Sequence, residues 1–457
     1  MITLEDIRAC FEGTVPSSLA TCSADGTPNV SYISQVYYVG HQQVALTFQF
    51  FNKTRQNILD NPQASLIVVD PVTAEQYRLN LIYIHTEETG PTFERMKAHL
   101  SGIASATGME TIFKLKGADI YKVISIEALN PKLPQQPEAP QISNSLLKLR
   151  HVLTSIIQAQ ELGELFELTL KALAKDMGIQ HAILLLPDES GTKLYTVESI
   201  GYPNSGVGAE FPIGFGVIGT AAKIRSPIRI NHMTTQYSYV QSMQDFFRST
   251  KDSASLETQI KFPGLDKPHS QIAIPIVDQH RLLGILYAES MQDYYFTYDF
   301  EDALMCVALL MAQAITKLQS VENCPMEENA TSAENDRLSG SQVAPALAQM
   351  APCQIRYFRK TKSIFIDEDY LIKGVAGCIL WTLLQLYQKE DRRQFSNKEL
   401  RLNKLLDLPD IDDNLEARLI LLKRRLKERC DFIDIRKTGR GVFELDISKP
   451  FTLAILD

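Results

Sequence analysis

Alternation of apolar and polar residues predicts a group of strands at the start of the chain. Residues 18–33 contain two extended runs separated by Asp25-Gly26, a pair that favours a tight hairpin turn. Two more strands are predicted within residues 36–51 on either side of Gly40-His41, others at 65–69 and 119–126, and a helix at 93–107. This pattern predicts a small, mostly antiparallel barrel.

The pattern changes after residue 145. Residues 146–177 carry apolar positions at helical spacing, and residues 303–319 form a second amphipathic stretch. Between them lie strand-like runs at 181–186, 193–199, 272–277 and 282–290. Helices packed on an antiparallel sheet make an α+β unit of the kind used by sensor domains.

A third pattern occupies the end of the chain. Short strand-like runs begin at Ile355 and Ser363, a buried helix is predicted at 375–387, and Ser396 is placed to cap a second helix. Residues 413–429 are predicted to form a third helix. Residues 432–445 then read as a strand, a Gly-X-Gly turn and a return strand.

Two polar segments separate these patterns. Residues 130–144 carry a proline at every third position in their central part, which favours an extended linker. Residues 321–352 contain few large apolar side chains and are also expected to be a flexible linker. The chain is therefore predicted to be a multidomain α+β protein with an N-terminal module (1–130), a middle module (143–320) and a C-terminal module (353–457).

Composition and charge narrow the function classes. The chain of 457 residues has a formal net charge of −8, but residues 353–457 hold 21 Lys/Arg against 17 Asp/Glu, a net charge of +4. One basic module on an acidic body points to an acidic partner for that module. Seven cysteines without Cys-X-X-Cys spacing predict no zinc site and fit a reducing cytoplasm. The longest apolar run, residues 375–384, is about half a membrane span, so no membrane partner is expected.

The N-terminal module has one candidate binding segment, Asn52-Lys53-Thr54, at the point where a strand runs into a helix. An ammonium, a hydroxyl and helix-start amides together favour a phosphate group. With the Asp-Gly hairpin and the closing strand at 119–126, this segment resembles the FMN-binding split barrel of the pyridoxamine-phosphate oxidase-like superfamily. The resemblance implies FMN, with its phosphate held by Asn52, Lys53 and Thr54, and its ring beside Phe48, Gln49, Ser31 and Tyr32.

Two residues depart from that family's pattern, which has an arginine at the position of Ser31 and a basic residue at that of Thr54. The C-terminal substrate-binding segment of the true oxidases is also missing. Oxidation of pyridoxamine phosphate is therefore not expected. The alternative is a surface Lys-Thr pair at a helix start with no ligand.

The middle module contains Gly214-Phe-Gly216-Val-Ile-Gly219, formally a dinucleotide-binding pattern. No acidic residue follows about 20 positions later, which argues against a nucleotide. Together with Ser226-Pro-Ile and Ile274-Pro-Ile, the glycine-rich turn resembles a GAF domain. That resemblance implies an unidentified small-molecule ligand over the sheet, or dimerisation. The insertion at 233–269 is either a lid over that ligand or a helix filling its own groove.

The C-terminal module carries a basic helix, with Leu422-Lys-Arg-Arg-Leu426, followed by the predicted hairpin. This order resembles the winged-helix DNA-binding domain of response regulators. The resemblance implies that Arg418 faces the bases of DNA. It also implies phosphate contacts through Lys423, Arg424, Lys427, Lys437 and Arg440. Leu421 stands where that family often has a polar residue, so a protein partner for this helix and an ordinary solvated helix remain open.

No P-loop, nucleophile elbow or His-Glu-X-X-His pattern is present in the sequence. We therefore expect a cytoplasmic, ligand-responsive, homodimeric transcriptional regulator with flavin-type and GAF sensory modules. One alternative is an FMN-dependent oxidoreductase regulated by its GAF and C-terminal domains. The other is a signalling scaffold whose C-terminal domain binds protein.

Overall fold

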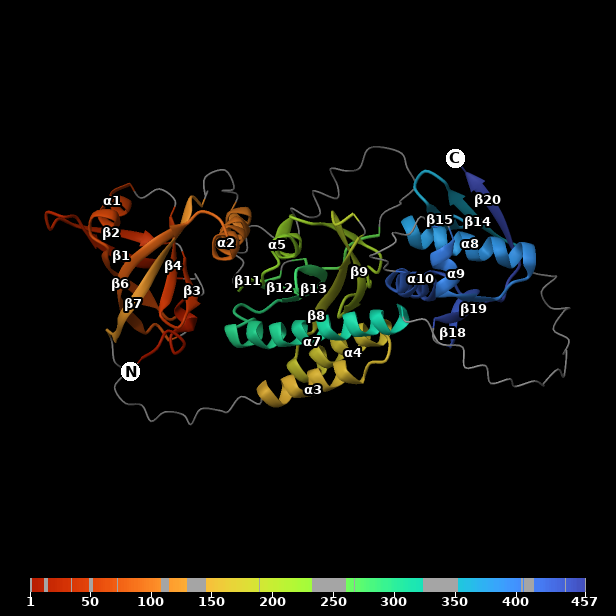
Figure 1. Cartoon of the computed structure of the whole chain (residues 1–457), viewed down its shortest axis with the longest axis horizontal. Coiled ribbons are helices and arrows are strands. Elements are labelled where there is room, and N and C mark those ends of the chain that lie inside the picture. Colours follow the sequence, from red (N-terminus) through yellow and green to blue (C-terminus); the bar gives the residue numbers. More distant parts are fainter. Residues whose placement is uncertain are drawn as a thin grey trace.

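The computed structural model describes residues 2–11, 15–33, 35–48, 52–71, 73–107, 115–129, 145–188, 190–231, 260–266, 268–323, 352–403, 406, 415–439 and 441–456. Figure 1 shows three groups of elements side by side along the long axis of the molecule. They correspond in order to the N-terminal, middle and C-terminal modules, and each has its own sheet or sheets.

The N-terminal module is a seven-stranded antiparallel sheet in the order β2-β1-β5-β6-β7-β4-β3. Alternate side chains of β1 are buried, as the sequence pattern predicts, and the core gathers around Leu66 and Tyr121. The long strand β6 was not predicted from the sequence. The elements are η1 (Arg8–Phe11), β1 (Ser17–Cys22), β2 (Pro28–Ile33), β3 (Val36–Gly40), β4 (Gln43–Phe48), α1 (Asn52–Asp60), β5 (Gln63–Val69), β6 (Gln76–Glu87), α2 (Pro91–Thr107) and β7 (Gly117–Ala128).

The middle module is a six-stranded sheet in the order β10-β9-β8-β13-β12-β11, with α3, α4 and α7 on one face and α5 on the other. Both faces are buried, so β8 and β12 are almost continuously apolar. The helix predicted at 146–177 is two helices. The elements are α3 (Ser145–Gln158), α4 (Leu162–Met177), β8 (His181–Pro187), β9 (Lys193–Ile200), β10 (Glu210–Pro212), α5 (Gly216–Ile224), β11 (Ile228–Ile230), β12 (Ser270–Asp278), β13 (Arg281–Ser290) and α7 (Tyr298–Asn323).

The glycine-rich turn is explained by close packing. Gly214 and Gly216 have positive φ angles, +86° and +64°, which favour glycine. A Cβ on Gly219 would lie 2.2 Å from the carbonyl oxygen of Pro212. These glycines let α5 begin directly against the strand before it, without any nucleotide.

Helix α7 contains the one stretch among the described residues, Tyr298–Ser320, that is long and apolar enough to cross a membrane. Its buried face, which includes Val307 and Met311, packs against the sheet, mainly against β12. A helix with one apolar face covered by a sheet is typical of the core of a globular α+β domain.

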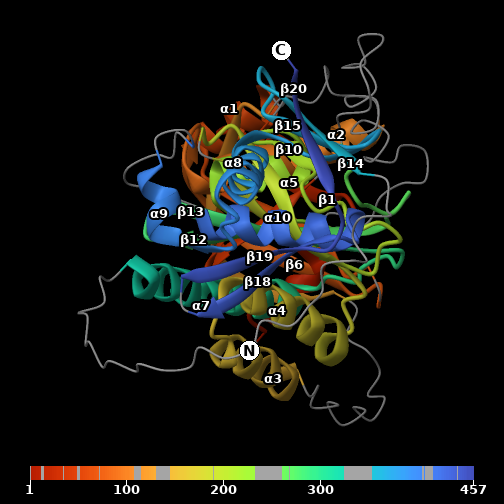
Figure 2. The same ribbon diagram turned by 90° about the vertical axis from the view of Figure 1, so that its right-hand side faces the viewer.

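The C-terminal module has two sheets, in the orders β16-β15-β14-β20 and β17-β19-β18, around α8, α9 and α10 (Figure 2). The predicted cap is confirmed: Ser396 Oγ accepts from the Glu399 amide, and the Glu399 carboxylate accepts from the Ser396 amide. Strand β20, parallel to β14, was not predicted. The elements are β14 (Cys353–Phe358), β15 (Ser363–Ile366), β16 (Asp369–Ile372), α8 (Gly374–Glu390), β17 (Gln394–Ser396), α9 (Asn397–Leu402), α10 (Leu415–Arg429), β18 (Ile433–Gly439), β19 (Val442–Ile447) and β20 (Phe451–Leu456).

Candidate functional site

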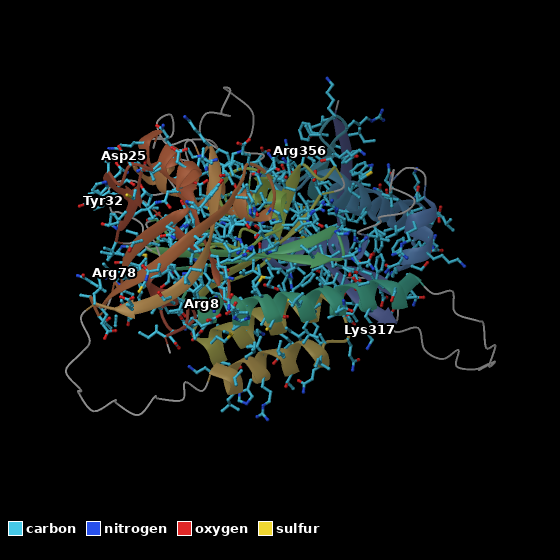
Figure 3. All side chains as sticks on the ribbon, turned by 60° about the vertical axis from the view of Figure 1, so that its left-hand side comes forward. Arg8, Asp25, Tyr32, Arg78, Lys317 and Arg356 are labelled. Carbon is cyan, nitrogen blue, oxygen red and sulfur yellow. The ribbon has the colours of Figure 1, made fainter. Side chains whose placement is uncertain are left out.

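The candidate flavin segment of the N-terminal module lies where α1 begins beside β2. Thr54 is buried, and its hydroxyl donates to Ser31 Oγ at 3.1 Å and accepts from Asn29 Nδ2 at 2.9 Å. The structure therefore brings two predicted residues, Thr54 and Ser31, together. Tyr32 follows Ser31 on the edge strand β2 and is 74% exposed; Figure 3 shows it at the outer side of the N-terminal module.

Lys53 is exposed at the start of α1 and makes no ion pair with another described residue. Its neighbour Arg55 is already engaged, with Nη1 2.5 Å from Asp119 Oδ1 and 2.6 Å from Thr86 Oγ1. Burial raises the pKa of Asp119, while Thr86 and Arg55 lower it in part. The charge of Arg55 is therefore used inside the barrel and is not free for a ligand.

These contacts limit what the described residues offer to a flavin phosphate. Thr54 donates its hydroxyl proton to Ser31, which leaves the Lys53 ammonium, the first-turn amides of α1 and the Ser31 hydroxyl as donors. An ammonium with several N–H and O–H donors fits a phosphate group. Gln49 and the side chains of Phe48 and Asn52, which the sequence placed near the flavin, lie outside the described residues.

The middle module contains a buried polar pair that the sequence analysis missed. Gln271 on β12 and Glu289 on β13 are directly opposite each other across the two strands and are 0% and 2% exposed. Glu289 accepts from the Leu265 amide at 2.6 Å and from the Tyr287 hydroxyl at 2.8 Å, and burial raises the pKa of its carboxyl. Within the described part of the chain, neither amide atom of Gln271 has a hydrogen-bond partner.

A buried amide without partners is costly, so this face of the sheet is suited to a ligand with both a donor and an acceptor. The signal in the sequence was a glutamine and a glutamate inside otherwise apolar strands. The insertion predicted to lie over this face is described only at residues 260–266, 268 and 269.

The basic helix α10 lies against the middle module, not in solvent. The Arg424 guanidinium makes an ion pair with Glu198, donates to the carbonyl of Val197, and donates to the carbonyl of Gly163 at 3.2 Å. The Arg424 side chain is 18% exposed. The Arg418 guanidinium lies 4.3 Å from the ring centroid of Tyr195, a cation–π contact.

Two further ion pairs join the modules. Lys437, on the hairpin, lies 3.0 Å from a carboxylate oxygen of Glu161. Lys373, at the start of α8, lies 3.1 Å from Glu210. The acidic partners Glu161, Glu198 and Glu210 were not singled out from the sequence, because only the fold places them opposite the basic residues.

The predicted DNA-contacting residues are thus divided between two surfaces. Arg418, Arg424 and Lys437 contact the middle module. Lys423 and Lys427, one helical turn apart on α10, are exposed. Arg440 lies outside the described residues, and its DNA role, like that of the others, stays a prediction.

The apolar residues of α10 explain its composition. Leu421 is 5% exposed, and Ile420 packs close to Gly163 of the middle module. A single cluster of buried apolar side chains runs through both modules; it includes Leu421, and Ile420 packs against it. The apolar residues of α10 suggested a protein partner, and in this structure they pack against the middle module of the same chain.

Among the described residues, no group of three or more His, Cys, Asp or Glu side chains is arranged to hold a metal ion.

Comparisons with known proteins identify the first two modules. The family model for pyridoxamine 5'-phosphate oxidase matches residues 3–121, and that for the GAF domain matches residues 161–315. The chain therefore contains a pyridoxamine-phosphate oxidase-like domain and a GAF domain. No curated protein matches the chain.

Solved structures resemble single modules of the chain. An FMN-binding protein from Syntrophomonas wolfei is 18% identical, covers 28% of this chain and 87% of its own, and has a TM-score of 0.25. The GAF domain of an Acinetobacter phosphoenolpyruvate-protein phosphotransferase is 18% identical over 40% of this chain and 99% of its own, with a TM-score of 0.31. Free methionine-R-sulfoxide reductase from Neisseria meningitidis is 16% identical over 39% and 93%, with a TM-score of 0.30.

Proposed function

We propose that this ligand-sensing multidomain protein is a cytoplasmic transcriptional regulator whose C-terminal module is a winged-helix domain that binds DNA. The oxidase-like and GAF modules sense small molecules, and the C-terminal module delivers the output. The observation that carries the proposal is that the basic helix α10, followed by the β18–β19 hairpin, packs directly on the GAF module. A conformational change in the GAF module can therefore move α10.

The order of elements in the C-terminal module supports the winged-helix assignment. Helices α8, α9 and α10 are followed by the β18–β19 hairpin, and β17 adds a third strand to that hairpin. In winged-helix and related folds, the last helix enters the major groove and the hairpin contacts the neighbouring backbone. Lys423 and Lys427 are exposed on α10 and are suited to phosphate contacts.

Equilibrium binding of the full chain to a fluorescent DNA duplex tests this function. We expect an affinity that falls as salt rises, and a salt slope smaller by about two in the Lys423→Ala, Lys427→Ala double variant, since each lysine contributes about one. Lys148→Ala, an exposed lysine on α3, is the control and leaves the slope unchanged. No binding at about 50 mM salt contradicts the DNA function, and equal slopes in all three proteins contradict the assignment of α10.

Association of two chains is part of the proposal, because a paired DNA site requires two output domains at fixed spacing. Exposed apolar side chains on the helical face of the GAF module, Leu146, Ile157 and Leu309, support it. Sedimentation equilibrium measures the association of the wild type and of the Leu146→Glu, Leu309→Glu double variant; we expect a wild-type dimer and a weaker dimer in the double variant. A wild-type monomer at micromolar concentration contradicts association of two chains.

A second candidate function is flavin binding by the N-terminal module, which the oxidase-like family match and the exposed Lys53 favour. When bound, FMN supplies hydride and electron transfer, while the residues of this chain hold its phosphate. Titration of the protein with FMN, followed by quenching of flavin fluorescence, tests it. We expect weaker binding in Lys53→Ala and unchanged binding in Lys122→Ala; unquenched flavin contradicts this function and, with it, the regulated-oxidoreductase alternative.

A further inference from the structure

The surface of α10 that faces the GAF module is held by charge as well as by apolar packing. Three basic residues from three different elements meet three acids: Arg424 of α10 meets Glu198, Lys437 of the hairpin meets Glu161, and Lys373 before α8 meets Glu210. The contacts are the ion pairs described above. A set of contacts spread over the helix and the hairpin fixes the orientation of the whole C-terminal module, not only of one side chain.

The acids occupy positions that suit DNA phosphates. Arg424 and Lys437 are the two residues of this surface predicted to contact phosphate, and both are neutralised by carboxylates of the GAF module. Arg418, predicted to face bases, is covered by the ring of Tyr195. A carboxylate and a phosphate accept the same charge-assisted hydrogen bonds from arginine. The GAF module and a DNA duplex therefore cannot use this surface at the same time.

Arg424 is largely buried, so the stability of its ion pair with Glu198 depends on both charges being present. Burial lowers the pKa of its guanidinium and raises the pKa of the Glu198 carboxyl, so each charge depends on the other. Removing one partner of a buried ion pair leaves the other charge uncompensated, which costs more than the pair contributes. The contact therefore tends to form or to open as a unit.

A structural connection runs from this surface to the polar pair of the GAF sheet. A cavity of about 790 Å³ lies between the end of α10 and residues 199–206, which cover the end of β9 and the turn after it. Tyr202, Arg425 and Glu428 line this cavity. Tyr202 also packs edge-on against His181, which pairs with Glu289 across β8 and β13. Binding next to Glu289 can thus move Tyr202 and, through it, the wall that supports α10.

We propose that Glu161, Glu198 and Glu210 form an intramolecular latch that holds the C-terminal module on the GAF module, so that the DNA-facing surface of α10 and the β18–β19 hairpin is occupied and DNA phosphates must compete for it. Ligand binding at the Gln271–Glu289 face opens the latch. This inference rests on the proposed DNA-binding function, and the experiment below separates the failure of one from the failure of the other.

The test compares full-length wild type, Glu198→Lys and Asp293→Lys. Asp293 is the control, because its ion pair is with His269 of the same module and not with the C-terminal module. For each protein, amide hydrogen exchange of residues 415–429 reports release of α10, and anisotropy reports affinity for a duplex. We expect at least tenfold faster exchange and at least tenfold tighter DNA binding in Glu198→Lys, and changes below about twofold in the control.

A charge-swapped variant distinguishes the loss of the ion pair from misfolding of the protein. Glu198→Lys combined with Arg424→Glu restores an ion pair, and we expect slow exchange of α10 to return. If exchange in Glu198→Lys equals that of the wild type, the latch is overturned. If exchange is faster and the swap restores it, while no variant binds DNA at low salt, the latch stands and the DNA-binding function is overturned.

Discussion

The GAF module meets its two neighbours in different ways. On one side, a continuous cluster of buried apolar side chains passes from α4 and α7 into α8 and α10 of the C-terminal module. On the other side, the clusters of the oxidase-like module contain only its own residues. There, α2 packs against α5 and β11. Arg8 pairs with Asp302 at 2.9 Å and lies 4.3 Å from the ring centroid of Tyr298, and Arg95 donates a hydrogen bond to Ser226 at 3.0 Å.

This difference separates two kinds of coupling. A shared apolar core couples the unfolding of two modules, whereas a junction that shares no apolar cluster couples them more weakly. We infer that the GAF and C-terminal modules form one cooperative unit and that the oxidase-like module is a second. Control of the output helix therefore passes directly from the GAF module.

The largest expected effect comes from cutting the shared core at Leu421. Leu421→Ala removes a buried side chain and should lower the free energy of unfolding by about 2–5 kcal/mol. Urea unfolding followed by Trp381 fluorescence reports the C-terminal module, and amide exchange of β8 reports the GAF module. Both should shift together, and Val30→Ala on the exposed face of β2 should shift neither. If amide exchange of β8 in Leu421→Ala equals that of the wild type, the GAF and C-terminal modules do not unfold as one unit.

The next effect is a pH dependence that arises at His99, a residue of the oxidase-like module close to Arg229 of the GAF module. His99 Nδ1 accepts from Gln35 Nε2 at 2.8 Å, and burial, together with the charge of Arg229, lowers the pKa of His99 to about 3. Because the unfolded imidazole has a pKa of about 6.5, the unfolded state binds the extra proton, and stability falls as pH drops below that value. Between pH 7 and 5 the loss is about 2 kcal/mol.

Thermal unfolding at a series of pH values measures this slope. His99→Gln should remove it, and His85→Gln, which changes an exposed histidine of β6, should keep it. An unchanged slope in His99→Gln shows that another group titrates.

A smaller effect is expected at Gln271. Replacing an unpartnered buried amide with an apolar side chain removes its desolvation cost, so Gln271→Leu should stabilise the GAF unit by about 1 kcal/mol. The same variant should also lose any rise in the unfolding temperature that an added ligand gives the GAF unit, as measured by calorimetry. Destabilisation by Gln271→Leu would mean that the amide has a structural partner.

The smallest effect is expected at the junction between the oxidase-like and GAF modules. Arg95→Ala removes one part-buried hydrogen bond to Ser226, and a single hydrogen bond contributes only about 1 kcal/mol to stability. Calorimetry of the full chain should show both transitions within a degree or two of the wild type. A large shift in the GAF transition would show that the oxidase-like module is coupled to it after all.

Local signals in the sequence predicted much of the fold. The Ser396 cap, the β12–β13 hairpin and the β18–β19 hairpin depend on neighbouring residues, and each is present. Strand β20 was missed because its partner, β14, is far away in the sequence. Strand β6 was missed because its buried positions alternate over only part of its length.

The sites were predicted less completely. Thr54 and Ser31 were assigned to the phosphate and the ring of a flavin, and the hydrogen bond between them could not be predicted from residue types. The apolar Leu421 signalled a partner for α10. Which surface it meets depends on Glu198 of another module, and no local pattern in the sequence encodes that pairing.

The most direct test of the central claim is a double-mutant cycle between Glu198 and Arg424. Amide exchange of α10 is measured in full-length wild type, Glu198→Gln, Arg424→Gln and the double variant. If the two side chains hold α10 on the GAF module, the double variant should lose less protection than the sum of the single variants, by about 1–3 kcal/mol. Strict additivity, with α10 equally protected in Glu198→Gln and the wild type, would contradict the claim.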